Sequence, residues 1–228
     1  MRSFGCGFLV LMTLAGCGDP RMAVPPTLAA TTEPLALTGT AGWNVGRLRL
    51  GASEGRVRRS TGETRLFDTF VARRGTAEFD LAGPELSRSF AGRCGSGERE
   101  TDLGVAVLPD RRFVYACQFA AIGEQPDGTL RLGEVAHGGG PLAGRTRAGD
   151  VALGATRLDI RPVHRFAGGG LPTGAPLGYS FERNGQPVGA VDLNGTSRTI
   201  HAPRQRGPER DAVLLAGLAL AVMLEPAD

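Results

Sequence analysis

From about residue 43 onward, the chain is a succession of short stretches in which apolar and polar residues partly alternate. The clearest of these are 47–50, 64–71, 76–81 and 103–108, and they are separated by Gly, Pro, Asp or Ser. Alternation with a period of two places every second side chain on the same face of a strand, and the separating residues favour turns. The pattern therefore predicts a mainly β domain built from many short strands.

Two Asn-Gly pairs stand near the end of this region. They lie at 184–185 and 194–195, ten residues apart, between the strand-like stretches 177–183, 187–193 and 196–201. Asn and Gly both tolerate the positive φ that a tight hairpin turn requires. A single pair would also fit an ordinary loop, but two pairs at this spacing predict a three-stranded antiparallel meander.

The last part of the chain has no alternation. Pro208-Glu209-Arg210-Asp211 is followed by thirteen residues without a polar side chain, 212–224, and then by Glu225-Pro226. Proline at the first helical position and acids in the first turn favour a helix start, and the later proline favours a stop, so we predict a helix over about 208–225. The helix is apolar on every side, yet thirteen residues are too few to cross a bilayer, which takes about 20. We therefore expect a buried helix that is threaded through a β-barrel.

Many short antiparallel strands followed by one apolar C-terminal helix resemble the tubby-like fold, which is shared by tubby domains, phospholipid scramblases and the plant LURP-one-related proteins. The resemblance is carried by residues 179–192, the strand that follows them, and the apolar stretch 212–224. It implies a single domain over 41–228, a closed antiparallel barrel of about 12 strands around the C-terminal helix. Tubby domains bind phosphoinositide headgroups through Lys and Arg, but no pair of residues here matches theirs, so only the fold is carried over.

A different signal stands at the N-terminus, where a short apolar run, 4–14, follows Arg2 and ends in Leu14-Ala15-Gly16-Cys17. The run is too short for a transmembrane helix, and an ordinary secretory signal ends in an A-x-A-like site that needs no cysteine. The four residues resemble the lipobox of bacterial lipoproteins. This resemblance implies that residues 1–16 are a signal peptide and that Cys17 is the lipid-bearing first residue of the mature chain.

The residues after the cysteine indicate where the protein would be held. In lipoproteins an Asp directly after the lipidated cysteine retains the protein at the inner membrane, and this position is Gly18. The resemblance therefore implies the periplasmic face of the outer membrane of a Gram-negative bacterium. Residues 17–40 are rich in Pro, Thr and Ala with little charge. We predict that they form a flexible tether, with a span of roughly 25 Å, between the lipid and the domain.

The charge balance excludes some classes of partner. The chain has 26 basic residues, all of them Arg, and 23 acidic residues. A balance this close to neutral argues against nucleic-acid binding, which calls for a strongly basic surface. The absence of Lys also means that the Gly-rich stretches 138–149 and 168–176 cannot be P-loops, so we interpret them as surface loops. Arginine clusters at 56–59, 73–74, 111–112 and 204–210 would suit either anionic lipid headgroups or solvated strand ends.

Two cysteines remain after Cys6 and Cys17 are assigned to the signal and the lipid. In 86–94 and 113–119 the alternation places Cys94 and Cys117 on the same faces as large apolar residues. Because thiols commonly pair in an oxidising compartment, a Cys94–Cys117 disulfide is expected, with two unpaired buried cysteines as the alternative.

No motif in the sequence indicates catalysis. The three histidines, His137, His164 and His201, are 27 and 37 residues apart, whereas metal sites usually include ligands only a few residues apart. Ser96 lies between two glycines but lacks the strand–elbow–helix context of a hydrolase nucleophile. We therefore expect no metal or other cofactor.

The hypothesis that fits these observations is a non-enzymatic lipoprotein that is bound to the membrane by its N-terminal lipid. It would act in binding or in envelope assembly, with an envelope protein as its partner. The alternatives are a barrel that binds a lipid or another apolar ligand, and an envelope hydrolase with an unrecognised site.

Overall fold

The computed structural model describes residues 21–40, 44–66, 70–99, 112–135, 146–195 and 198–224. These residues form twelve strands and two helices. In chain order the elements are α1 (Pro26–Thr31), β1 (Thr32–Thr38), β2 (Val45–Leu50), β3 (Ser53–Leu66), β4 (Phe70–Ala82), β5 (Phe90–Arg99), β6 (Arg112–Ala121), β7 (Gly128–Val135), β8 (Thr146–Leu153), β9 (Thr156–Val163), β10 (Gly178–Arg183), β11 (Gln186–Asp192), β12 (Arg198–Pro203) and α2 (Pro208–Val222).

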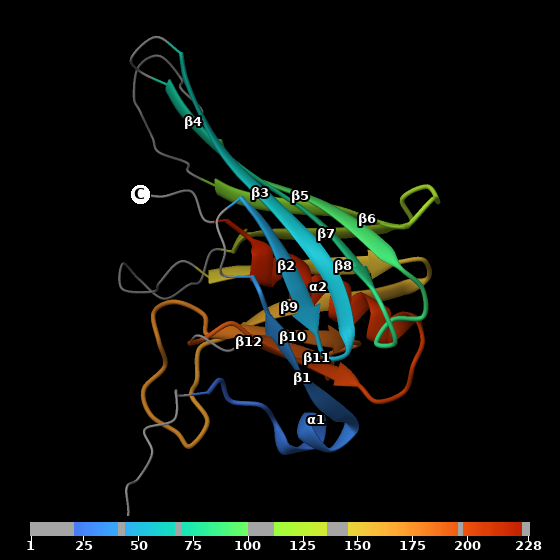
Figure 1. The fold of residues 1–228 in the computed structure, drawn as a ribbon. Coiled ribbons are helices and arrows are strands. Elements are labelled where there is room, and N and C mark those ends of the chain that lie inside the picture. Colours follow the sequence, from blue (N-terminus) through green and yellow to red (C-terminus); the bar gives the residue numbers. More distant parts are fainter. Residues whose placement is uncertain are drawn as a thin grey trace, which may run out of the picture.

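The strands form one closed antiparallel barrel. From β2 to β12 each strand pairs with the next in the chain, and β1 closes the sheet by pairing with both β2 and β12 (Figure 1). Side chains alternate between the interior and the outer face, as the sequence pattern predicts. The predicted mainly β barrel of about 12 strands is confirmed.

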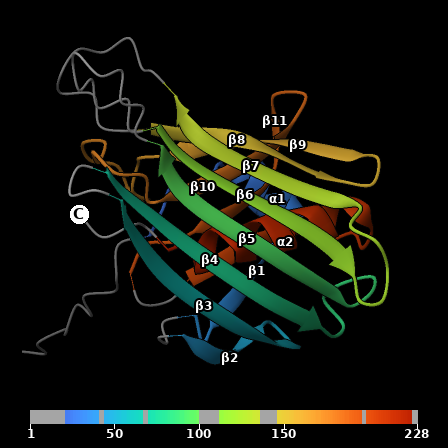
Figure 2. The same ribbon diagram turned by 90° about the horizontal axis from the view of Figure 1, so that it is seen from above.

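Helix α2 runs through the inside of this barrel, where the strands enclose it (Figure 2). All residues from Arg210 to Val222 are buried, which confirms a central apolar helix. The helix ends at Val222, three residues before the predicted end at 225, and Met223 is extended with φ −56° and ψ 127°. Side chains of the barrel bind the carbonyl groups of the last turn, so the helix needs no further turn to satisfy them. Of the described helices, none has the length and apolarity that a membrane span requires.

The two ends of α2 are bonded to the barrel wall. At its start, the Arg210 guanidinium is 1 % exposed and forms ion pairs with Glu33 and Glu85, while Nε donates to the Glu85 carbonyl at 3.0 Å. At its end, Tyr115 donates to the Ala219 carbonyl at 2.8 Å, and the side chain of Arg198 donates to Ala221. Burial raises the pKa of Tyr115, which keeps its hydroxyl protonated as a donor.

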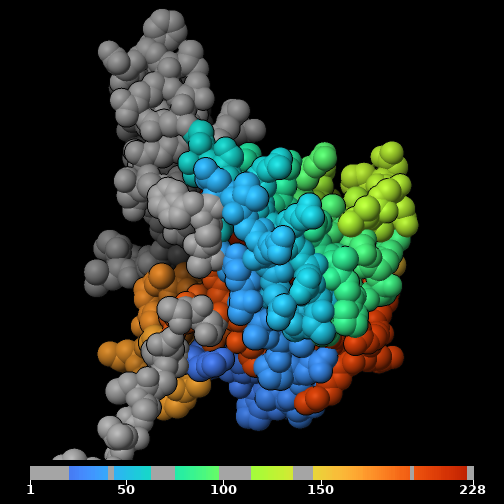
Figure 3. Space-filling model, viewed as in Figure 1, coloured from blue at the N-terminus to red at the C-terminus, as the bar shows by residue number. Residues whose placement is uncertain are grey.

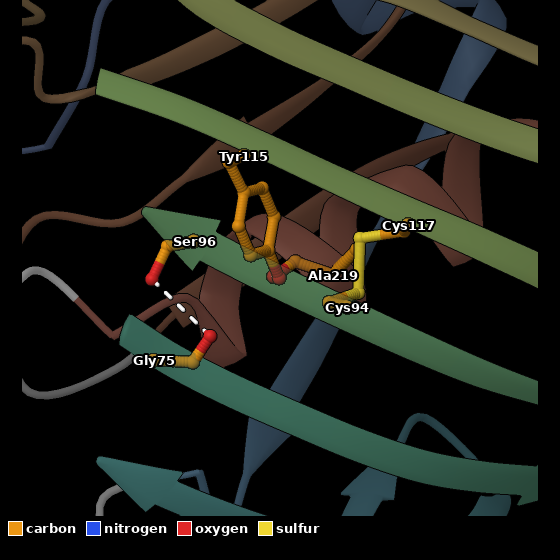
Figure 4. The surroundings of a disulfide bond; sticks show 6 residues. All are labelled: Gly75, Cys94, Ser96, Tyr115, Cys117 and Ala219. Carbon is orange, nitrogen blue, oxygen red and sulfur yellow. Dashed lines mark hydrogen bonds between the residues drawn. A yellow bond between two sulfur atoms is a disulfide. The ribbon is translucent and has the colours of Figure 1, made fainter. Parts of the chain in front are cut away.

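The Cys94–Cys117 disulfide is confirmed. The two residues are direct partners on β5 and β6, with Cα atoms 4.0 Å apart, and both side chains point inward. Figure 4 shows the disulfide on the same two strands as Tyr115 and Ser96, beside Ala219 of α2. Closing a loop of 23 residues stabilises the fold by about 3 kcal/mol in the chain-entropy model. Ser96 on β5 donates to the Leu224 carbonyl at 3.1 Å, and Tyr115 on β6 donates to Ala219. The disulfide therefore ties together two strands whose side chains bind the chain at the end of the helix.

The predicted tether is wrong over part of its length. Residues 32–38 form β1, which pairs along its length with β12, and the preceding residues lie against the outside of the barrel. Leu37 points into the core, where it is buried, while Pro34 and Ala36 face outward. The tether prediction relied on low charge and on Pro and Thr, but a strand that closes a barrel needs little more than two or three inward apolar side chains.

The predicted meander is confirmed over β10, β11 and β12. Asn184 and Gly185 both have positive φ, 52° and 76°, as a two-residue hairpin turn requires.

The predicted strand at 103–108 and the lipid site at Cys17 lie outside the described residues.

Helix α2 approaches β11 closely because β11 has a glycine at the contact. A Cβ atom on Gly189 would lie 2.6 Å from Cγ1 and 2.7 Å from Cγ2 of Val213, and 3.1 Å from the His201 carbonyl oxygen. These distances are shorter than van der Waals contact, so a side chain here would force the helix away from the wall.

We expect Gly189→Ala to lower the free energy of unfolding by about 1–3 kcal/mol, because it overpacks this contact. Val213→Ala removes the two colliding methyl groups, so the double variant should be more stable than the sum of the two single effects predicts, by at least about 0.5 kcal/mol. Urea unfolding of all three variants measures this coupling.

The matched control is Gly95→Ala on β5. A Cβ atom there would meet nothing within 4 Å, so its effect should stay within about 0.5 kcal/mol. Strictly additive effects of the two substitutions at the helix contact would contradict the close approach of α2 to β11.

Candidate functional site

A segment before the barrel, residues 21–31, packs against its outer surface, and we call it the N-terminal strap. Its first residues pair with the chain after β9: Ala23 N donates to the Arg165 carbonyl, and Ala167 N donates to the Arg21 carbonyl, each at 2.8 Å. The Met22 amide also donates to the Asp192 carboxylate at 3.0 Å. The strap is therefore held by directional bonds to two separate parts of the barrel.

Apolar side chains of the strap form a second, smaller core outside the barrel. Met22 and Leu28 are 2 % and 1 % exposed, and they pack with Leu177 and Ala190. Burial of two large side chains contributes several kcal/mol at about 1.5–3 kcal/mol each, which is enough to order a short segment. Helix α1 by itself contributes little to the stability of the strap, because it has only six residues.

A groove of about 650 Å³ runs between the strap and the outer face of β9, β10 and β11. The strap side is apolar, the floor is formed by outward residues of the three strands, and the charged side chains of Arg161, Arg165 and Glu182 stand around it. Among its lining residues are Met22, Val24, Leu28, Val163, Ser180 and Ala190. A groove of this size and lining suits a small, mostly apolar ligand with a polar end.

Charged and polar groups gather beneath the start of the strap. Asp192 is 3 % exposed and accepts from the amides of Met22 and Asn194, while Arg21 donates to the Thr199 hydroxyl at 3.2 Å. His201 is partly buried on the same outer face of β12. Burial lowers the pKa of His201, the Asp192 carboxylate acts against this by favouring the charged imidazolium, and Arg21 lowers the pKa further.

The histidines do not converge in the part of the chain that is described. His164 lies just after β9, where its ring Nδ1 is 2.9 Å from the Thr173 carbonyl, whereas His201 is on β12 and His137 lies outside the described residues. Within the described ranges, no group of three or more His, Cys, Asp or Glu side chains could hold a metal ion.

Sequence reasoning missed the strap and the burial of two charged residues at the start of α2. Met22, Val24 and Leu28 show no period that separates them from a linker, because their partners lie more than a hundred residues away. The sequence pattern places Arg210 and Asp211 in the first helical turn and gives no indication of their burial. They are 1 % and 2 % exposed, and the Asp211 carboxylate accepts from the Ser87 amide at 3.1 Å.

Comparison of the chain with protein-family models, with curated proteins and with solved structures finds no match.

Protonation of His201 is expected to destabilise the fold. Because the pKa of His201 is below its ordinary value of 6.5, the unfolded chain takes up a proton more readily than the folded protein. The contribution of His201 should be constant above pH 6.5 and should weaken stability as the pH falls below that value. Urea unfolding between about pH 8 and pH 5 should give a shallower decline for His201→Gln than for the parent protein.

Two neighbouring substitutions should move the pKa of His201 in opposite directions, as followed by NMR titration. Asp192→Asn removes an attraction for the imidazolium and should lower the pKa further, whereas Arg21→Gln removes a repulsion and should raise it. Parallel pH profiles for the parent and His201→Gln would contradict this account of the site.

Proposed function

We propose that this protein is a lipid-anchored lipoprotein of the bacterial envelope, held at the periplasmic face of the outer membrane, that acts by binding a partner at its outer surface without catalysing a reaction. The single observation that carries the proposal is the sequence Leu14-Ala15-Gly16-Cys17 behind a short apolar run. The fold is compatible with it, because the barrel interior is occupied by α2 and the surface is what remains for binding.

The position of the strap supports the anchor. Only four residue steps separate Cys17 from Arg21, which is the first of the described residues and is bonded to the barrel. A fully extended chain covers at most about 3.6 Å per residue, so the lipid would lie within roughly 14 Å of the barrel surface. In place of the long tether expected from the sequence, a lipid at Cys17 would hold the barrel next to the membrane.

The expected result for Cys17→Ser is complete loss of palmitate incorporation and release of the protein from the membrane fraction, because the thiol that accepts the lipid is absent. Metabolic labelling and fractionation of cells that express the full chain measure both. The matched control is Cys6→Ser, which lies within the same signal segment and should be labelled as the parent is. Undiminished labelling of the Cys17 variant would contradict the proposed anchor.

A second candidate function is the binding of a lipid or another apolar ligand in the groove beside the strap. The barrel interior was the expected place for such a ligand, but α2 and the inward side chains fill the described part of it. The groove instead offers about 650 Å³ against the outer face of β9, β10 and β11. It has the size of a small-molecule pocket, with Arg161 and Arg165 available to an acidic end group.

The substitution Ser180→Trp tests this candidate, because Ser180 lies on the floor of the groove and is only partly buried. An indole there should occupy the groove and lower the amount of lipid that is extracted with the purified protein. A conservative control is Ser180→Thr, which should leave the amount of extracted lipid unchanged. Equal lipid in the parent and the Trp variant, by mass spectrometry of organic extracts, would rule the groove out as the binding site.

A further inference from the structure

The two ends of the barrel differ in what they carry. At one end short connections join β2 to β3, β8 to β9 and β10 to β11. At the other end are the start of the strap, the long connection 164–177 and the last turn of α2, and we call this the exit end (left in Figure 1). Arg21, the first described residue, therefore lies at the exit end.

Exposed apolar side chains concentrate at the same end. Five large apolar side chains of the described residues are exposed, and four of them lie toward the exit end: Val45 begins β2, Val114 is near the start of β6, Val135 ends β7 and Leu171 is in the connection 164–177. The fifth, Ile122, follows β6 at the opposite end. Leu171 is the most exposed of the five, at 89 %.

The loop that carries Leu171 is tied to the strap at its base. Thr173 N donates to the His164 carbonyl at 2.8 Å, and Ala167 is bonded to Arg21. The loop tip between these bonds projects from the barrel beside the strap, as the orange segment at the lower left of Figure 3 shows. A single exposed leucine is common on protein surfaces. What distinguishes Leu171 is its place on this loop, beside the strap and at the same end of the barrel as the exposed Val45, Val114 and Val135.

The charge at this end is suited to an anionic surface. Arg21 and Arg165 are exposed beside the loop, and Arg58 is exposed on β3 opposite Val45. The far end also carries exposed arginines, among them Arg157, Arg204 and Arg206, and its acids Glu124 and Asp127 pair with Arg88. Among the described residues, what distinguishes the exit end is the larger number of exposed apolar side chains beside its arginines. Basic residues next to exposed apolar side chains are the combination that binds an anionic bilayer surface.

We propose that the exit end rests on the bilayer that holds the lipid of Cys17, with Leu171 inserted among the lipids and Arg21 and Arg165 among anionic headgroups. The inference rests on the proposed lipid anchor, because the four steps from Cys17 to Arg21 allow no other end of the barrel to reach the membrane first. Insertion of one leucine is weak by itself, but the anchor keeps the loop at the surface, so that even a weak contact is populated.

The test uses the full lipidated protein, purified from membranes and reconstituted into vesicles of phosphatidylethanolamine and phosphatidylglycerol. Leu171→Cys and Ile122→Cys are labelled separately with the environment-sensitive fluorophore NBD. With Cys94 and Cys117 in the disulfide and Cys17 acylated, the introduced thiol is the reactive one. Ile122 is the matched control, an exposed apolar residue at the opposite end.

We expect blue-shifted emission and several-fold slower reduction by external dithionite for the probe at 171 than for the probe at 122. Equal spectra and equal rates at the two positions would overturn the docking. Protection of position 171 in native envelopes but not in vesicles would also overturn it, and would assign this surface to a protein partner. Replacement of the vesicle lipids by phosphatidylcholine should reduce the protection, and equal protection would overturn the role of the arginines.

Mass spectrometry of the same protein separates this proposal from the anchor. If the first residue is an acylated Cys17 and the probe at 171 is nevertheless exposed, the docking fails while the proposed function stands. If Cys17 carries no acyl chain, both the anchor and the docking that depends on it are overturned.

Discussion

The structure depends on enclosing an apolar helix that has charged side chains in its first turn and backbone carbonyl groups to be bonded in its last turn. Burial of the side chains of α2 drives the barrel to close around it, but the hydrophobic effect has no direction and would allow the helix to turn or slide. Directional bonds remove that freedom. Arg210 is bonded to Glu85 and Glu33 at one end, and Tyr115 and Arg198 bind carbonyl groups at the other. Since an unpaired charge inside a barrel would be strongly destabilising, these contacts also make any other position of the helix unfavourable.

Closure of the barrel places a demand on the N-terminal segment. Without β1, the strands β2 and β12 would each leave an edge with unpaired backbone groups. Residues 32–38 are the segment that removes both edges, and Glu33 on this strand is also a partner of Arg210. The strap continues this arrangement, because the chain before β1 runs along the outside of the barrel and buries Met22 and Leu28 there.

The features that could be predicted are those with a local signal. The alternation of apolar residues predicts strands, Asn184-Gly185 predicts a hairpin, and the uninterrupted stretch 212–224 predicts a buried helix. Two inward cysteines predict their disulfide because strand alternation fixes the face of each. The strap and the buried charges could not be predicted in this way. Arg210 lies in a local sequence typical of an exposed helix start, and its partner Glu85 is 125 residues away.

With a lipid at Cys17 as proposed, the strap would make the anchor and the barrel a single mechanical unit. Any force on a lipid at Cys17 would reach Arg21 and Met22 within a few residues, and from there pass to Thr199 and Asp192 through hydrogen bonds. Those two residues are on β11 and β12, which approach α2 closely at Gly189 and Ile200. The membrane attachment would therefore act on strands that are in direct contact with the central helix. A long flexible tether would leave the orientation of the barrel free, whereas this short and bonded connection restricts it.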